Sequence, residues 1–331
     1  MAYTLAQYAK LETSPIHKYV LVNMIRDMKI QDVLPFHDVN SLKTSALQWR
    51  VLPGVSFRAL GNDYTEDTTG DVQEVYETLC ILGGLVKFDR VYDKLTGSTI
   101  KDPKQLIMDM KLKALALKWN DYFINGDTGT DPLGFQGLKK RISLMPTRQK
   151  ISCGNSDSVG LDVTASAANV NKFWTKMEVG HRYCAGGSVT AMFCNEDMLL
   201  GFGRSLRYIN SAGGQFLDFT KDSFERQVMT YKGAPIYDMG LKADQSTEIM
   251  TDTEAGGSAA SDTCSVYICN FDEEQGIVGT QLGALEVVQD AKKDVATANQ
   301  TLIEWVLGLA QYGSYGLTRL WNILAPDTWT A

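Results

Sequence analysis

Hydrophobic and polar residues alternate along residues 47–58, with the period of a β-strand that has one apolar face. The apolar positions are the odd-numbered ones: Leu47, Trp49, Val51, Pro53, Val55 and Phe57. A polar, acidic link follows at residues 61–71, and a second strand-like run returns over residues 72–81 until Gly83 and Gly84 break it. The pattern predicts a long β-hairpin over residues 44–82.

A two-stranded ribbon of this kind is only marginally stable alone in water. Its apolar face therefore needs cover, either from the same chain or from a neighbouring subunit. The acidic link indicates a solvated tip or a partner for a basic patch. Five apolar residues of the ribbon form a candidate subunit interface: Leu47, Trp49, Val51, Val55 and Phe57.

Residues 103–124 have the clearest helical pattern of the chain. Asp102 suits the N-cap and Pro103 the first helical position. Apolar residues follow at helical spacing: Met108, Leu112, Leu115, Trp119 and Tyr122. Three lysines, Lys104, Lys111 and Lys118, recur every seven residues and lie near one line on the polar side. That line is either a solvated face or a face turned toward something anionic.

The rest of the chain predicts an N-terminal arm, a mixed α/β region and closing strands. The expected elements, in chain order, are a short helix at 18–28, a helix at 169–179 stopped by Gly180, a strand at 189–194, a helix capped by Asn195, a flexible loop at 251–263, a strand at 265–271, and strands over 300–324 that bend at 313–316.

Composition and motifs exclude several classes of function. The chain has 331 residues, 44% hydrophobic and 21% charged, which is ordinary for a globular protein with a sizeable core. A net charge of −7 argues against a protein that grips nucleic acid over its whole surface. No P-loop, dinucleotide fingerprint, H-E-x-x-H or G-x-S-x-G sequence occurs. We therefore expect a protein that is not an enzyme, with no catalytic, cofactor-binding or metal-binding residues.

The cysteines, histidines and termini agree with that expectation. The six cysteines form no C-x-x-C pair and are expected to be buried, reduced thiols. His181 precedes Cys184 by three residues, and we interpret both as structural. Asp127 and Asp131 lack the further acidic ligands of a calcium loop. The N-terminus is no signal peptide, and the apolar run at 302–317 is too short to span a bilayer, so no membrane partner is expected.

A family resemblance arises at the end of the predicted helix. The helix ends in an apolar-Asn-Gly-Asp-x-Gly turn over residues 119–129 and continues to Gly137-Leu138. This resembles the end of the spine helix in tailed-phage major capsid proteins of the Hong Kong 97-type shell fold. The strand-Asn-helix step at 192–197, Gly233-x-Pro235-Ile236 and the closing strands at 305–322 add support. The resemblance covers nearly the whole chain in element order.

The resemblance implies an α+β capsid fold of four parts. These are an N-terminal arm at 1–43, an extended β-hairpin loop at 44–82 that lies over a neighbouring subunit, a peripheral domain at 83–149 plus 291–331 with the spine helix at 103–124, and an axial domain at 150–290.

The implied function is mechanical. Many copies would self-assemble as pentamers and hexamers into an icosahedral shell that encloses the double-stranded DNA of a tailed phage. The protein would reside in the virion after assembly in the host cytoplasm. Its partners would be copies of itself, a scaffolding protein, a portal protein, possible decoration proteins and DNA through weak local contacts. Lys104, Lys111 and Lys118 are the candidate lumen-facing basic strip.

Two departures from the family pattern refine the expectation. The recognisable fold starts almost at Met1, so we expect the scaffolding protein to be separate. Some family members cross-link through a lysine of the extended loop, but residues 60–71 contain none and Lys43 lies at the base, so we expect a non-covalent shell. Two alternatives stay open: an encapsulin-like nanocompartment shell around an enzyme, and a soluble α/β enzyme with a concave pocket.

Overall fold

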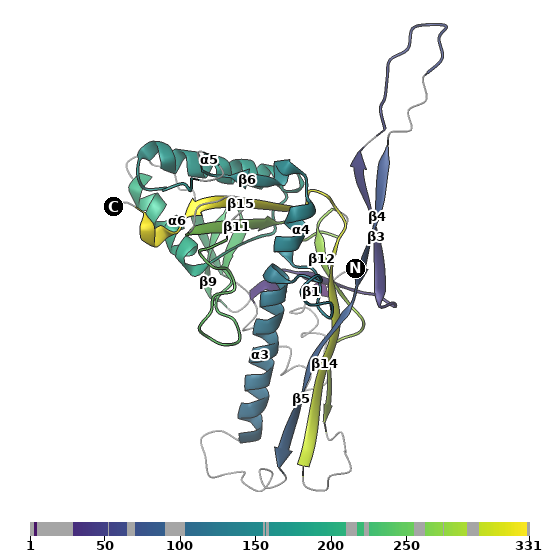
Figure 1. Cartoon of the computed structure of the whole chain (residues 1–331), viewed down its shortest axis with the longest axis vertical. Coiled ribbons are helices and arrows are strands. Elements are labelled where there is room, and N and C mark those ends of the chain that lie inside the picture. Colours follow the sequence, from purple (N-terminus) through teal and green to yellow (C-terminus); the bar gives the residue numbers. More distant parts are fainter. Residues whose placement is uncertain are drawn as a thin grey trace.

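The protein is described here from a computed structural model. The structure describes residues 3–4, 29–51, 53–64, 70–89, 103–154, 156, 159–209, 217–221, 225–254, 262–273, 275–289 and 298–329. Figure 1 shows a body of sheets and helices from which a two-stranded ribbon projects at one end, while helix α3 and strands β5 and β14 extend toward the other. The helix expected at residues 18–28 lies outside the described residues.

A seven-stranded sheet forms the centre of the body. Its order is β6-β15-β11-β7-β10-β9-β8. The strands, in that order, are Lys150–Ser152, Leu317–Leu324, Thr263–Cys269, Ala191–Cys194, Ala234–Asp238, Gln227–Tyr231 and Leu217–Lys221. Strands β7 and β11 are buried along their whole length. Strands covered on both faces carry near-continuous apolar runs; β7 is apolar throughout, and β11 is apolar apart from Thr263 and Ser265.

Two hydrophobic cores lie on opposite faces of that sheet. Along β7, Met192 packs into one core and Phe193 into the other. Helices α5 (Ala167–Tyr183) and α6 (Glu196–Ile209) cover the Met192 face. The second core joins Phe193 to Phe123 of α3 (Pro103–Asn125), with ring centroids 5.5 Å apart. The central sheet thus connects all parts of the body.

A six-stranded sheet packs against α3. Its order is β1-β2-β12-β14-β13, and β5 pairs with the free side of β14. The strands, in that order, are Tyr3–Thr4, Pro35–Asp38, Ile277–Gln281, Ala298–Gln311 and Glu286–Gln289, with β5 at Cys80–Asp89. Phe36 of β2 lies 5.2 Å from Trp305 of β14 and 6.4 Å from Trp119 of α3, by ring centroids. These aromatic contacts hold α3 to the sheet.

Shorter elements complete the fold. Helix α4 spans Leu138–Leu144, and 3-10 turns lie at Lys29–Asp32, Thr147–Gln149, Ala185–Gly187 and Pro326–Thr328.

Several expected elements are confirmed. Helix α3 begins at Pro103 and ends at Asn125, close to the expected bounds. Asn195 caps α6, because its Oδ1 accepts a hydrogen bond from the Met198 amide at 3.2 Å. Strands β14 and β15 flank the expected bend at 313–316. Five of the six free cysteines are buried, and Cys80 is half-buried.

Two expectations, which concern three glycines, were wrong. Gly180 does not stop α5, which continues to Tyr183. Gly83 and Gly84 do not break a strand, because β5 continues through both. A Cβ at Gly180 would lie 2.6 Å from Leu320, and one at Gly84 would lie 2.2 Å from the Lys111 side chain. These glycines therefore permit close packing and do not end an element.

The turn after α3 is closed by a backbone contact between Gly126 and Gly137. The Gly137 amide donates to the Gly126 carbonyl at 2.9 Å, which closes the loop between them. A Cβ at Gly137 would lie 2.5 Å from the Tyr122 carbonyl oxygen and 2.7 Å from the Gly126 nitrogen. The Asn-Gly-Asp turn and Gly137-Leu138, on which the resemblance rested, thus form one closed structure.

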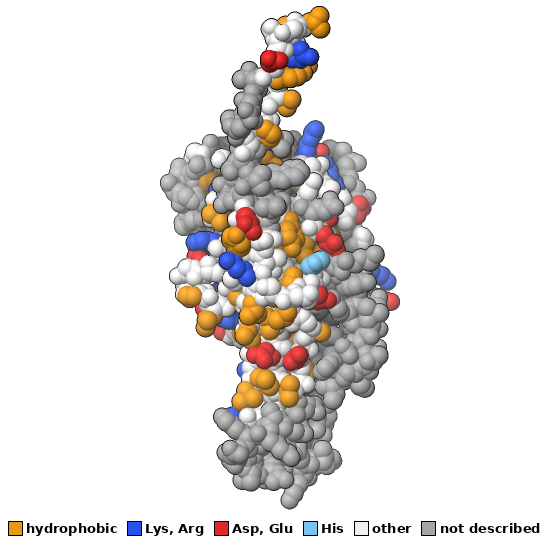
Figure 2. All heavy atoms as spheres, turned by 90° about the vertical axis from the view of Figure 1, so that its right-hand side faces the viewer, with side chains coloured by type: hydrophobic (Ala, Val, Ile, Leu, Met, Phe, Trp, Pro, Cys, Tyr) orange, Lys and Arg blue, Asp and Glu red, His pale blue; other side chains and the backbone are white. Residues whose placement is uncertain are grey.

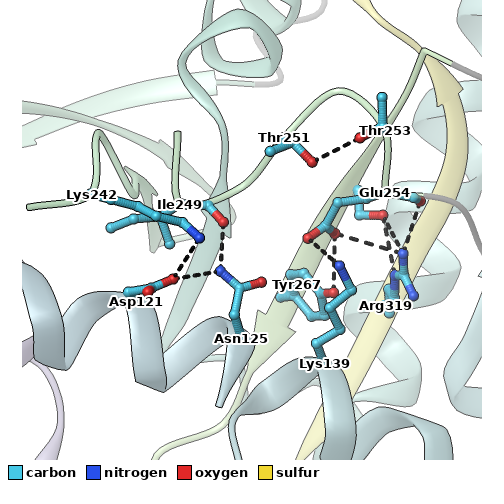
Figure 3. Close-up of polar contacts among 11 residues, drawn as sticks. Asp121, Asn125, Lys139, Lys242, Ile249, Thr251, Thr253, Glu254, Tyr267 and Arg319 are labelled. Atoms are coloured by element: carbon cyan, nitrogen blue, oxygen red, sulfur yellow. Dashed lines mark hydrogen bonds and ion pairs between the residues drawn. The ribbon is translucent and has the colours of Figure 1, made fainter. Parts of the chain in front are cut away.

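Polar contacts join α3 and α4 to the segment at residues 242–254 (Figure 3). Asn125 Nδ2 donates to the Ile249 carbonyl at 2.7 Å, and Lys242 Nζ lies 3.4 Å from Asp121 Oδ1. Glu254 is almost fully buried and is satisfied by the cluster Lys139, Tyr267 and Arg319. A buried carboxylate needs such partners, so this cluster fixes where the segment sits.

We expect Gly137→Ala to lower the free energy of unfolding by about 1 kcal/mol or more, because the added methyl meets backbone atoms that cannot move independently. Thermal unfolding of the unassembled subunit measures this. Gly203→Ala is the matched control: it lies in α6 with no atom within 4 Å of its Cβ position, and it should be neutral or stabilising by up to about 1 kcal/mol. Equal effects of the two substitutions would contradict the argument.

Candidate assembly interface

The expected hairpin is confirmed as a ribbon separate from both large sheets. Among the strands that the structure describes, β3 (Lys43–Val51) and β4 (Asp71–Thr78) pair with each other and with no third strand, in antiparallel register. The register places Trp49 opposite Val72 and Leu47 opposite Glu74. Tyr76 lies on this same face and is exposed, with its hydroxyl donating to Glu74 at 2.7 Å. Positions 47 and 49 therefore belong to the same ribbon face as Tyr76, whose side chain is exposed to solvent.

The predicted strand was too long. Strand β3 ends at Val51, so Val55 and Phe57 lie beyond it. Pro53 has no amide proton to donate, and the Gly70 Cα approaches its ring so closely that a Cβ would lie 3.2 Å from Pro53 Cδ. The ladder of strand hydrogen bonds consequently ends before Pro53. The apolar residues at odd positions after it, Val55 and Phe57, are not part of a strand.

The residues beyond the ladder form an apolar tip, which we call the loop tip (residues 53–64). Val55, Phe57 and Leu60 are 99%, 108% and 102% exposed, and Figure 2 shows hydrophobic side chains at this projecting end. Burying each would be worth about 1.5–3 kcal/mol. Arg58 lies among them, with Nη1 donating to the Asn62 carbonyl at 2.9 Å. Sequence reasoning missed Leu60 because it sits at an even position.

The chain leaves the ribbon for the body at Leu79. This residue is buried and its amide donates to the Leu42 carbonyl at 2.9 Å, after which β5 pairs with β14. Arg141 of α4 reinforces the ribbon's base. Its guanidinium contacts Glu77 Oε1 of β4 at 2.5 Å, the Gln136 carbonyl at 2.9 Å and the Leu309 carbonyl at 2.6 Å. No sequence motif marked Arg141, since Glu77 and Leu309 are distant along the chain and the nearby Gln136 contributes only its backbone carbonyl.

The three candidate lysines have different surroundings. Lys104 lies in the first turn of α3. Lys111 is half-buried against the backbone of Gly84, which turns it toward β5. Lys118 is exposed, with Nζ 4.6 Å from the centre of the Tyr122 ring. Of these lysines, Lys118 therefore faces solvent, whereas Lys111 packs against strand β5.

The remaining candidate chemistry is structural. The hydrogen bond from the Tyr122 hydroxyl to Asp131 raises the pKa of Tyr122 to about 12 and lowers the pKa of Asp131. Asp127 accepts from the Gly129 amide and pairs with Lys140, which lowers its pKa. Burial raises the pKa of Cys184 to about 12, which leaves a poor nucleophile.

No cluster of three or more metal-ligating side chains occurs among the described residues, and no helix of the described chain is long and apolar enough to cross a membrane.

Solved structures match this fold over nearly its whole length. The SrpI encapsulin complex from Synechococcus elongatus PCC 7942 has a TM-score of 0.59 at 13% identity, covering 90% of this chain and 88% of the other. The capsid of a native GTA particle gives 0.56 at 12% identity, covering 91% and 90%. The cyanophage A-1(L) capsid gives 0.56 at 11% identity, covering 93% of each chain.

The chain has the Hong Kong 97-type capsid fold. No family model and no curated protein sequence matches the chain. The Hong Kong 97-type fold is thus shared here through backbone architecture, at sequence identities too low to carry residue roles across. The expected α+β class and the suspected resemblance are both confirmed at the level of the fold.

We expect Arg141→Met to destabilise the subunit by about 3–5 kcal/mol, because it leaves Glu77 and two carbonyls at the ribbon base without their partner. Chemical denaturation of the unassembled subunit measures this. Glu178→Gln is the control, since it removes the exposed ion pair with Lys232 and should change stability by less than about 1 kcal/mol. A cost for Arg141→Met no larger than the control's would count against an anchoring role.

Proposed function

We propose that this protein is the major capsid protein of a tailed phage. Many copies assemble as pentamers and hexamers into an icosahedral shell around double-stranded DNA. The observation that carries the proposal is the loop tip, which holds three fully exposed apolar residues on a ribbon projecting from a well-packed body. Such a surface suits burial against another copy. The likeness to phage capsids over about 90% of the chain supports the same role.

The proposed interface extends along the ribbon. It includes Leu47, Trp49 and Val51 on β3 and Val55 and Phe57 in the loop tip. Stable contacts between proteins usually bury more than about 1,200 Å² in total. A ribbon that lies along a neighbour can supply much of such an area without unfolding the body. The role is structural and non-enzymatic.

The proposal includes partners and a location. Copies of the chain are the principal partner, joined by a scaffolding protein, a portal protein and decoration proteins, and held together without covalent cross-links. The finished shell belongs to the virion and assembles in the host cytoplasm.

A nanocompartment shell is the second candidate, favoured by the likeness to the SrpI encapsulin complex. Such a shell would enclose an enzyme in place of a genome. Genes for a portal or terminase beside this one would favour the phage, and a gene for a cargo enzyme would favour the compartment. A soluble α/β enzyme would give a small oligomer in the experiment below.

We expect the purified wild-type chain to form closed particles, and the variant Val55→Ser, Phe57→Ser, Leu60→Ser to remain unassembled. The three substitutions remove apolar area that the subunit leaves in water. Since about 1.4 kcal/mol corresponds to tenfold in association, assembly should need at least about a hundredfold more subunit. Size-exclusion chromatography and negative-stain microscopy measure this.

Two controls accompany that experiment. The triple variant should unfold at the same temperature as the unassembled wild-type subunit, because the tip side chains are fully exposed. The conservative variant Phe57→Leu should still assemble. A wild-type chain that stays a compact monomer in every solution condition would refute the shell proposal.

Contact with DNA through Lys104, Lys111 and Lys118 is also proposed. We expect Lys118→Gln to reduce the packaged DNA more than Lys111→Gln, because Lys118 is exposed and Lys111 lies against Gly84. DNA content per particle, measured by the ratio of absorbance at nucleic-acid and protein wavelengths, reports this. Unchanged DNA content after substitution of all three lysines would contradict the basic strip.

A further inference from the structure

The outward face of the six-stranded sheet carries apolar residues interrupted by two glutamates, and exposed Lys87 lies farther along β5 on the same face. Ile81 and Leu85 of β5 are exposed on this face, as is Val288 of β13. Between the apolar rows, Glu304 of β14 lies opposite Gly83 on one side and Glu286 on the other. We call this surface the acidic strip; its residues are Ile81, Leu85, Glu286, Val288, Leu302 and Glu304. Figure 2 shows acidic side chains flanked by hydrophobic ones over these strands.

The two glutamates form an unfavourable pair within one subunit. Residues directly opposite on antiparallel strands have Cβ atoms only about 4.5–5.5 Å apart, and like charges there destabilise the sheet. No hydrogen bond or ion pair joins either carboxylate to another described residue. A cation placed between them would remove the repulsion and gain two charge-assisted contacts.

The loop tip has the complementary pattern. Arg58 is a cation flanked by exposed Phe57 and Leu60, just as Glu286 and Glu304 are flanked by apolar rows. A guanidinium has five N–H donors, and one hydrogen bond to Asn62 uses only part of them. Its planar fork suits two carboxylates at once.

A subunit cannot make this contact with its own strip. Figure 1 shows the ribbon rising from the body at one end, while β5 and β14 run toward the other end. A loop tip that reaches the acidic strip must therefore belong to a second copy, and it has the required charge and apolar flanks.

We propose that Arg58 of one copy binds between Glu286 and Glu304 of a neighbouring copy, with Phe57 and Leu60 packed on the apolar rows beside them. The contact rests on the proposed shell function and names the partner of the loop tip. Charged groups at an interface set register and exclude wrong alignments more than they add affinity. The ion contact thus fixes where along the neighbour the ribbon lies.

A charge-exchange experiment tests the contact. Arg58→Glu should reduce the yield of closed particles about tenfold or more, and Glu286→Lys with Glu304→Lys should do the same. All three substitutions together restore the attraction in reverse and should recover particles to within about threefold of wild type. Arg207→Glu on α6 makes the same charge change on an exposed residue elsewhere and should leave the yield unchanged.

A second measurement locates the contact directly. Leu60→Cys combined with Val288→Cys should give disulfide-linked multimers on mild oxidation of assembled particles. Leu60→Cys combined with Leu200→Cys should not, because Leu200 is exposed on α6, away from the strip.

The outcomes separate the two proposals. A wild-type chain that forms no particles overturns the shell function. Wild-type particles with an Arg58→Glu variant that assembles equally well, or with no recovery in the combined variant, overturn the contact alone. Loss of assembly only on changing the glutamates also overturns it, because the strip would then hold another partner.

Discussion

An apolar loop tip that its own subunit cannot cover is the constraint on which the rest of the structure depends. Val55, Phe57 and Leu60 are fully exposed at the end of a ribbon whose strands β3 and β4 pair with no other described strand. The body cannot fold over them, because β3 and β4 diverge from both large sheets and are anchored at their base by Arg141. Burial of these side chains therefore needs another molecule, and this requirement is the physical basis of the proposed association between copies.

The packing of the body fixes the position of the ribbon. The central strands of the seven-stranded sheet are buried on both faces, with Met192 and Phe193 in different cores, so the two sides of the body cannot move independently without opening packed surfaces. Gly126 and Gly137 close the turn that joins α3 to α4, and α4 carries Arg141. The position of the ribbon therefore depends on backbone contacts far from its tip.

The sequence predicted the elements whose signals are local. Helix α3, the Asn195 cap and the hairpin follow from apolar spacing and from residues that favour caps and turns. The roles predicted for Gly84 and Gly180 were wrong. A glycine that ends an element cannot be told from the sequence alone from one that lets another side chain pack closely, as Lys111 and Leu320 do here. Glu286 and Glu304 were missed because only the strand register places them opposite each other. Arg141 was missed because its partner Leu309 is far away along the chain.

Stability and assembly occupy different residues in this architecture. Gly137 and Arg141 act on the folded body, and in the proposed shell the loop tip and acidic strip act on contacts between copies. Because the tip contributes little to folding, its sequence can change with the partner surface while the fold persists. This separation is consistent with structural likeness over about 90% of the chain at 11–13% identity. It also explains why the fold alone does not distinguish the two proposed shells, one around a genome and one around an enzyme: neither the body packing nor the loop tip depends on the proposed cargo.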